Sequence, residues 1–396
     1  MNFDDSEEQR LLNDSVRRFI GKDYGFEARK RIVASPEGWS AQAWATLAEI
    51  GVLAVPVPAE AGGFGGGAMD LMGTLEAIGE ALVVEPVLAT ATGARFVARG
   101  GTVEQKGELL TGVVERGVKL AFAHTEAESR YELSHVAVTA RRDREGFVID
   151  GEKRVVLHAP CADRILVSVR TSGGVTNPRG VSLLLVDPKA AGLTLRRYRT
   201  IDELPAADML FRGVRVPADA LVGVEGEALP LIEDVVDFGT ALLCAEAVGA
   251  IRYANEATLE YLKTRRQFGV PIGSFQALQH RMVDMMISYE QARSMASLAC
   301  AKVDADVAPA ERKRIVSAAK VRIADACRHV SQESVQLHGG MGMSEELKVS
   351  HTFRRLTMIA QQFGDADHHL ERFSNVAIPA SLVIPAQAGI QWDLPP

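Results

Sequence analysis

The hydrophobic positions in the first third of the chain repeat with the period of a helix. Leu71, Leu75, Ile78 and Leu82 follow one another at spacings of four, three and four residues, which places them on one face of a helix. The glycine-rich segment 62–67 before them predicts a loop. No clear strand precedes these glycines and no Gly-Lys-Ser/Thr follows, so they do not indicate a phosphate site. Residues 1–118 are predicted to form an N-terminal helical domain.

The pattern changes near residue 119 to short β-rich runs separated by turn residues. These runs occupy residues 136–140, 147–149, 154–157, 165–169 and 181–186, with a turn predicted at 143–146. Pro205 and Pro217 suit loops better than the interior of a sheet. Residues 119–225 therefore predict a small antiparallel β domain, whose last strand ends near residue 216.

Helical periodicity returns from about Leu229. Leu278, Met282, Met285 and Tyr289 again fall at spacings of four, three and four, and methionines in such a stripe indicate a core-facing helix. Residues 304–310 predict a connector between two helices. The order defines an α+β fold: an N-terminal helical domain, a central antiparallel β domain and a C-terminal helical bundle over 226–376. The tail, 377–396, lacks an amphipathic period and contains four prolines, so we expect it to be poorly ordered.

Composition and charge narrow the class of protein. The 44 Lys and Arg against 51 Asp and Glu give a net charge of −7, which argues against nucleic-acid binding. No apolar run approaches the roughly 18 residues of a membrane span, and the acidic start lacks the plan of a signal peptide. The four cysteines are far apart and indicate neither a disulfide framework nor a zinc site. We expect a reduced, cytoplasmic protein.

Two segments carry candidate chemistry. In segment 261–280 a basic helix is predicted to stop at Gly269, and a new helix to start after Gly273. Arg265, near that helix end, presents a guanidinium fork suited to a pair of anionic oxygens. In segment 335–343, Gly339 and Gly340 allow polar atoms of another group to approach the backbone closely. Taken singly, these features are better explained by a solvated arginine and a helix-ending turn.

Taken together, the two segments resemble the acyl-CoA dehydrogenase family from about residue 8 to residue 373. The signature is Arg-x-Gln-Phe-Gly-x-Pro-Ile-Gly-x-Phe-Gln at residues 265–276. Segment 363–370 is more similar to the small subunits of pimeloyl-CoA-type dehydrogenases. The resemblance implies FAD-dependent α,β-desaturation of an acyl-CoA thioester. A base removes the α-proton, a hydride passes to the flavin, and electrons leave to an electron-transfer flavoprotein.

The resemblance also implies two sets of cofactor-binding residues. One set reaches across a subunit interface to the FAD of the neighbouring subunit: Arg265, Phe268, Gln336, Gly339 and Gly340. The other lies on the first strand and faces the flavin of the same subunit: Phe122, His124 and Thr125.

The sequence departs from the family at the catalytic base. The two positions that hold the glutamate base in family members are occupied here by Phe363 and Gly239. Glu246, two helical turns past Gly239, is a weak substitute, because an ion pair on the helix face is its more usual role. The segment Asp365-Ala366-Asp367-His368-His369 resembles a set of metal ligands. A structural network is the preferred interpretation, and no metal site is predicted.

The positions that face the flavin are also altered. Tyr131 replaces a small serine, and Val155 and Leu157 replace an aromatic residue and a hydroxyl residue. Arg130 suits the far carboxylate of a substrate, although a surface arginine explains it as well. We therefore hypothesise a small subunit that completes the FAD site of a homologous large subunit. The alternatives are a self-sufficient homo-oligomeric dehydrogenase with a relocated base and a non-catalytic acyl-CoA-binding or assembly protein.

Overall fold

The computed structural model describes residues 6–377, so the predicted tail lies almost wholly outside the described residues. Ser6 caps the first helix, because its hydroxyl accepts a hydrogen bond from the Gln9 amide. In α4, Leu71, Leu75 and Ile78 are buried as the stripe predicts, whereas Leu82 is the left-handed cap after the helix. The helices of this part are α1 (Glu7–Asp23), α2 (Phe26–Ala34), α3 (Ala41–Ile50), α4 (Ala68–Ala81), α5 (Val87–Gly100), α6 (Val103–Gln105) and α7 (Thr111–Arg116).

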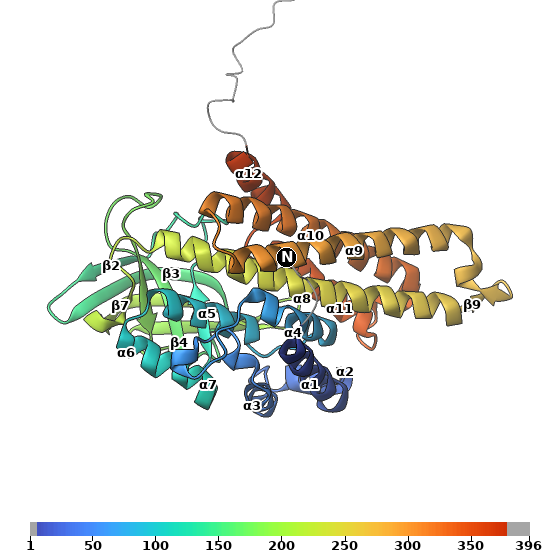
Figure 1. Ribbon diagram of the computed structural model, residues 1–396, viewed down its shortest axis with the longest axis horizontal. Coiled ribbons are helices and arrows are strands. Elements are labelled where there is room, and N and C mark those ends of the chain that lie inside the picture. The colour runs from blue at the N-terminus through green and yellow to red at the C-terminus, as the bar shows by residue number, and fades with distance from the viewer. Residues whose placement is uncertain (1–5, 378–396) are drawn as a thin grey trace, which may run out of the picture.

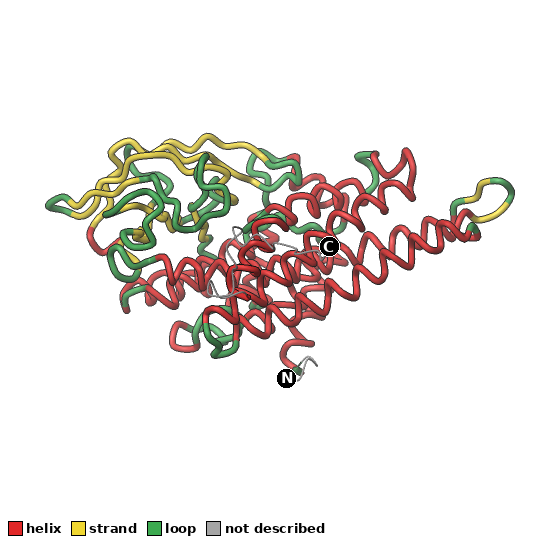
Figure 2. Tube along the Cα trace, turned by 90° about the horizontal axis from the view of Figure 1, so that it is seen from above, coloured by secondary structure: helices red, strands yellow, loops and turns green. Residues whose placement is uncertain are grey.

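A twisted sheet follows, at one end of the molecule (Figures 1 and 2). Its main path runs β6-β7-β3-β2-β4-β5-β8, and β1 pairs with β4. Most pairs are antiparallel as predicted, but β1 and β2 each run parallel to β4. The strands are β1 (Leu120–Ala123), β2 (Thr139–Arg142), β3 (Gly146–Leu157), β4 (Arg164–Arg170), β5 (Val181–Val186), β6 (Leu193–Arg199), β7 (Pro205–Pro217) and β8 (Leu221–Val222).

The strand boundaries differ from the predicted ones in two places. Runs 147–149 and 154–157 belong to one strand, β3, which stays paired with β7 through two irregularities in register. An interrupted apolar pattern is the expected signature of such bulges. Residues 136–138 precede β2 and lie outside any strand. The two prolines, Pro205 and Pro217, are the first and last residues of β7, where a missing amide hydrogen is tolerated.

Long helices form the remainder of the chain. They are α8 (Leu229–Thr264), α9 (Gln276–Asp304), α10 (Pro309–His338), α11 (Lys348–Gln361) and α12 (Ala366–Ala377). Of the predicted stripe on α9, Met285 and Tyr289 are buried and Leu278 and Met282 are half-buried. The predicted connector is shorter than expected, since only residues 305–308 separate α9 from α10.

The first helix of the signature ends earlier than predicted. Helix α8 stops at Thr264, and a hairpin of β9 (Arg266–Gln267) and β10 (Val270–Pro271) follows. Phe268 and Gly269 form its turn with φ of 53° and 82°. Two consecutive left-handed residues match the twist of a two-residue hairpin, so the chain turns here instead of extending the helix. The hairpin lies at the end of α8 and α9 far from the sheet (Figures 1 and 2).

Helices α4 and α8 cross with their backbones in close contact. A Cβ atom on Gly79 would lie 1.9 Å from the Glu246 carbonyl oxygen, and one on Gly249 would lie 1.8 Å from the Glu76 carbonyl oxygen. Only glycine allows this approach. The crossing joins the N-terminal helices to the C-terminal bundle in one continuous hydrophobic core, and the sheet encloses a second core.

Candidate functional site

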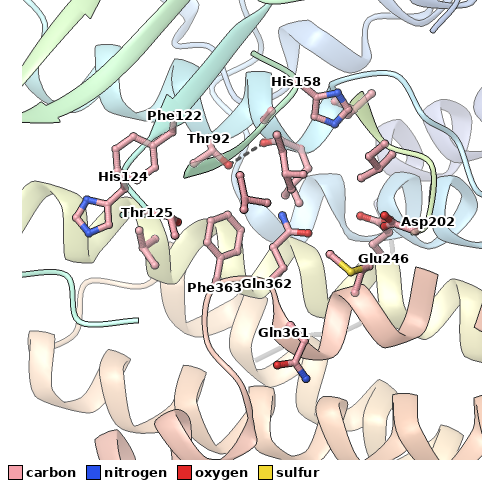
Figure 3. A pocket seen from close by; sticks show the side chains of 18 of the residues that line it. Thr92, Phe122, His124, Thr125, His158, Asp202, Glu246, Gln361, Gln362 and Phe363 are labelled. Atoms are coloured by element: carbon pink, nitrogen blue, oxygen red, sulfur yellow. Dashed lines mark hydrogen bonds between the residues drawn. The ribbon is translucent and has the colours of Figure 1, made fainter. Parts of the chain in front are cut away.

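A cavity of about 390 Å³ lies where the N-terminal helices, the sheet and the C-terminal helices meet. Figure 3 shows the side chains that line it. The cavity brings the residues predicted to face the flavin of the same subunit together with Phe363, one of the two predicted base positions. Among its lining residues are Thr92, Phe122, His124, Thr125, Arg130, Tyr131, Val155, Leu157, Glu246 and Phe363.

The two base positions meet in space. A Cβ atom on Gly239 would lie 3.2 Å from the Phe363 ring and 3.3 Å from the Thr92 hydroxyl oxygen. The Phe363 ring therefore packs against the helix at the place where the other position would project a side chain. A phenyl ring cannot accept a proton and glycine has no side chain, so neither of these two residues can act as a base.

The turn that carries Phe363 is firmly held. Phe363 has a φ of 60° and Gly364 a φ of 119°. The buried Lys320 ammonium donates to the carbonyl oxygen of Gly364 at 2.6 Å, and a ring nitrogen of His369 lies 3.0 Å from the carbonyl oxygen of Phe363. Asp365 caps α12 by accepting a hydrogen bond from the His368 amide at 2.9 Å. These hydrogen bonds hold the segment in place. Within residues 6–377 no cluster of metal-ligating side chains is found.

Glu246 lies in an ion-pair chain at one side of the cavity. The Nε atom of Arg355 donates to Glu246 Oε1 at 2.7 Å, and its Nη1 atom donates to Asp202 Oδ2 at 2.7 Å. All three side chains are buried. Buried charges persist when they are paired and hydrogen-bonded in this way. Glu246 thus lines the cavity, but its carboxylate is bound to a guanidinium.

The predicted flavin-facing strand forms another wall. The rings of Phe122 and His124 stack with centroids 5.5 Å apart. A ring nitrogen of His124, Nδ1, pairs with the Ser168 hydroxyl at 2.9 Å, whereas Nε2 is buried with no hydrogen-bond partner in the described chain. Burial, with the nearby Lys153 ammonium, lowers the pKa of His124 from 6.5 to about 3. His124 is therefore neutral at physiological pH.

Behind this wall, a buried ammonium supports the loop after β1. Lys153 is fully buried and donates to Glu126 Oε1 at 2.6 Å and to the Ser168 hydroxyl at 2.9 Å. Burial lowers its pKa from 10.5 to about 8. Glu126 also accepts hydrogen bonds from the amides of Ala137 and Val138. The network fixes the start of the loop on which Arg130 and Tyr131 lie.

Two positions of the wall lack the aromatic and hydroxyl side chains that the resemblance implies beside a flavin ring. Val155 and Leu157 carry no hydrogen-bonding group in their side chains, and Thr125 is the one hydroxyl of the predicted strand set. The Tyr131 hydroxyl donates to Gln361 Oε1 at 3.2 Å and so connects the loop to α11. Polar ring atoms buried against Val155 and Leu157 would lose hydrogen bonds to water that these two side chains cannot replace, which opposes binding.

The residues predicted to reach a neighbouring subunit lie elsewhere. Arg265 is exposed, and Phe268 is 91% exposed in the hairpin turn. Helix α10 ends close to the end of α8, as the contact between the rings of Tyr261 and His338 shows, whose centroids are 4.5 Å apart. The structure therefore brings segments 261–280 and 335–343 together at the end of the molecule that carries the hairpin, away from the sheet (Figure 1). Gln336, Gly339 and Gly340 are exposed at this end.

Several polar residues that line the cavity were not predicted from the sequence. They are Glu85, His158, Asp202 and Arg355. Arg355 is separated along the chain from Glu246 by 109 residues and from Asp202 by 153. No periodicity links positions so far apart, so the sequence offered no signal for them.

Comparison with known proteins identifies the family. Models of the N-terminal, middle and C-terminal domains of acyl-CoA dehydrogenase match residues 6–116, 121–214 and 229–375. The chain therefore belongs to the acyl-CoA dehydrogenase family, and its three-part fold is confirmed. Within residues 6–377 no helix has the length and apolarity needed to cross a bilayer.

Individual relatives cover nearly the whole chain. Acyl-CoA dehydrogenase FadE12 of Mycobacterium tuberculosis is 31% identical, over 91% of this chain and 93% of its own. The L-prolyl-[peptidyl-carrier protein] dehydrogenase of a Serratia strain is 28% identical, over 88% and 90%. Among solved structures, the FAD complex of PigA superposes with a TM-score of 0.86 at 26% identity, over 94% of this chain and 98% of PigA. The predicted cofactor, FAD, agrees with that structure.

Proposed function

We propose that this chain is the small subunit of a hetero-oligomeric, cytoplasmic acyl-CoA dehydrogenase. It completes the FAD site of a homologous large subunit and does not carry out the desaturation in its own cavity. The observation that carries the proposal is the contact of Phe363 with Gly239, which leaves both base positions without a carboxylate. Proton removal from the α-carbon requires a base within hydrogen-bond reach of it.

The outward-facing residues support the same role. Arg265 has no side-chain partner within residues 6–377 and stands exposed beside the Phe268 turn. A guanidinium fork of this kind binds paired anionic oxygens such as those of a pyrophosphate. Gly339 and Gly340 have no atom within 4 Å of a Cβ added to them, so their backbone is open to approach by a partner. We infer that Arg265, Phe268, Gln336, Gly339 and Gly340 contact the FAD of the large subunit.

The names of two relatives describe proteins that consist of more than one component. A solved steroid ACAD bears the paired name Tcur3481-Tcur3483 and superposes with a TM-score of 0.84 at 28% identity, over 94% of this chain and 98% of that one. The caffeyl-CoA reductase-Etf complex subunit CarC of Acetobacterium woodii is 25% identical, over 88% and 92%. By this likeness we propose acyl-CoA as substrate and an electron-transfer flavoprotein as electron acceptor.

The test is the flavin content of the chain alone and in complex. We expect the purified chain to be colourless, and its complex with a co-expressed homologous large subunit to contain one FAD per large subunit. Arg265→Ala should weaken retention of FAD in the complex, whereas Arg144→Ala, on the exposed turn before β3, should leave it unchanged. An isolated chain that holds one FAD and oxidises acyl-CoA at ordinary dehydrogenase rates would refute the proposal.

Glu246 favours one alternative, a self-sufficient enzyme, because its side chain lines the cavity. Glu246→Gln keeps the shape of the side chain and removes its ability to accept a proton. If Glu246 were the base, this variant would lose activity by several orders of magnitude while its thermal unfolding stayed cooperative. We expect instead that the activity of the complex is retained.

A further inference from the structure

The cavity has a polar region that its flavin-facing wall does not use. Figure 3 shows His158, Asp202 and Glu246 on one side of the view, and Phe122, His124 and Thr125 on the other. Phe363 and Thr92 lie between the two groups. A ligand that enters past the Phe363 ring therefore meets ionisable side chains at the side near His158.

Most polar atoms of this region already have partners. Arg355 binds Glu246 and Asp202, and the second oxygen of Asp202 accepts from the Thr200 hydroxyl. Glu85 accepts hydrogen bonds from the Tyr24 hydroxyl at 2.5 Å and from the Ser40 amide at 3.0 Å. The carboxylates and the guanidinium thus satisfy one another or the surrounding protein.

His158 is the exception. It is 6% exposed and lines the cavity, yet Nδ1 is buried with no hydrogen-bond partner in the described chain, and Nε2 makes no hydrogen bond there either. A buried polar group without a partner costs about 1–3 kcal/mol. Burial and the Arg355 guanidinium lower the pKa of His158 from 6.5 to about 4, so the ring is neutral at physiological pH.

The surrounding charges select the partner of this imidazole. A carboxylate would approach Asp202, Glu246 and Glu85, and like charges in a buried site repel strongly. An ammonium group would approach the Arg355 guanidinium, whose charge disfavours a second cation at His158. The nearby Glu246 and Asp202 carboxylates are already paired with that guanidinium. A carbonyl oxygen accepts only, so it fits one imidazole tautomer. A hydroxyl both donates and accepts, so it pairs with either tautomer.

We propose that this part of the cavity binds the far end of an acyl chain that carries a hydroxyl group, with the His158 imidazole as its hydrogen-bond partner. The proposal rests on the acyl-CoA ligand of the proposed function, which this cavity would bind without desaturating it, and narrows that ligand to hydroxylated acyl groups. The proposal also argues against a dicarboxylyl substrate bound by Arg130. Arg130 is exposed, and the buried part of the cavity near His158 is rich in carboxylates.

Binding by calorimetry tests the proposal without requiring turnover. The full chain, alone and in its complex, is titrated with octanoyl-CoA, ω-hydroxyoctanoyl-CoA, ω-aminooctanoyl-CoA and suberyl-CoA. Hexanoyl and decanoyl pairs cover the reach of the cavity. We expect the hydroxylated ligand of one chain length to bind about five- to tenfold more tightly than its unsubstituted counterpart, the gain of one buried hydrogen bond.

The variants assign the effect to His158. His158→Phe keeps an aromatic ring and removes both nitrogens, so the preference for the hydroxylated ligand over octanoyl-CoA should disappear. His158→Asn keeps a polar group, tolerates the left-handed backbone at φ 61° and serves as the folding control. Circular dichroism and thermal unfolding verify that both variants fold.

Four outcomes would overturn the proposal: equal binding of octanoyl-CoA and its hydroxylated form, tighter binding of suberyl-CoA or of the amino ligand, a hydroxyl preference that survives in His158→Phe, or no binding of any thioester. None of these depends on flavin. A chain that holds its own FAD but prefers the hydroxylated ligand would refute the subunit role alone.

Discussion

At the scale of single residues, a buried neutral imidazole makes stability depend on pH. The unfolded chain protonates His158 near pH 6.5, whereas the folded protein resists protonation down to about pH 4. Between these values the unfolded state binds more protons, so stability is retained above the unfolded pKa and is lost as the pH falls toward the folded one.

We therefore predict that His158→Asn flattens the acid side of the stability profile. Between pH 7 and pH 5 the wild-type chain should lose about 2 kcal/mol more unfolding free energy than the variant. Urea unfolding of both proteins at the two pH values measures the difference. His124 and His369 titrate in both proteins and cancel in the comparison. Equal losses in the two proteins would mean that His158 is not held neutral.

At the scale of elements, the crossing of α4 and α8 depends on glycine. Gly249→Ala would place a methyl group 1.8 Å from the Glu76 carbonyl oxygen, and a backbone atom in a packed helix cannot move aside easily. We predict a loss of roughly 1–3 kcal/mol or more in unfolding free energy, the cost of overpacking. Thermal and urea unfolding measure it.

Gly21→Ala is the matched control for that variant. Gly21 lies in α1, and a Cβ atom there would have no atom within 4 Å. Alanine is favoured over glycine in a helix by up to about 1 kcal/mol, so this variant should be as stable as the wild type or more so. If both substitutions had the same effect, the close crossing would not be the cause.

At the scale of the whole molecule, one face of α9 is suited to subunit contact. The side chains of Val283, Met286 and Ile287 are about half exposed. They occupy positions i, i+3 and i+4 of the helix, which places them on one helix face. Contiguous exposed apolar side chains indicate a protein–protein interface. The face belongs to the helix that follows the hairpin, so it extends from the residues proposed to reach the partner's FAD.

We predict that Ile287→Asp weakens association while the fold is retained. A charge at the centre of an apolar contact is desolvated without compensation. Size-exclusion chromatography with light scattering should show a smaller species, and circular dichroism an unchanged helix content. Leu11→Asp replaces an isolated exposed leucine on α1 and should leave the mass unchanged. An unaltered assembly in Ile287→Asp would place the interface elsewhere.

Much of the architecture was predictable because it depends on local periodicity. The stripes in α4 and α9 and the alternation in the β segment predicted the order helices, sheet, helices. The end of α8 was not predictable in this way. The left-handed pair Phe268 and Gly269 ends the helix region in a hairpin, and a phenylalanine in that conformation has no clear signal in sequence.

By itself, the sequence determined the family. It also predicted that both base positions lack a carboxylate and that the outward-facing residues are kept, since each prediction depends only on which residue stands at which position. Tertiary structure alone decided that Phe363 packs on Gly239, and that Arg355 joins Glu246 to Asp202 beside an unpartnered His158. These contacts join residues more than a hundred positions apart. Only the folding of three domains around one cavity brings them into contact.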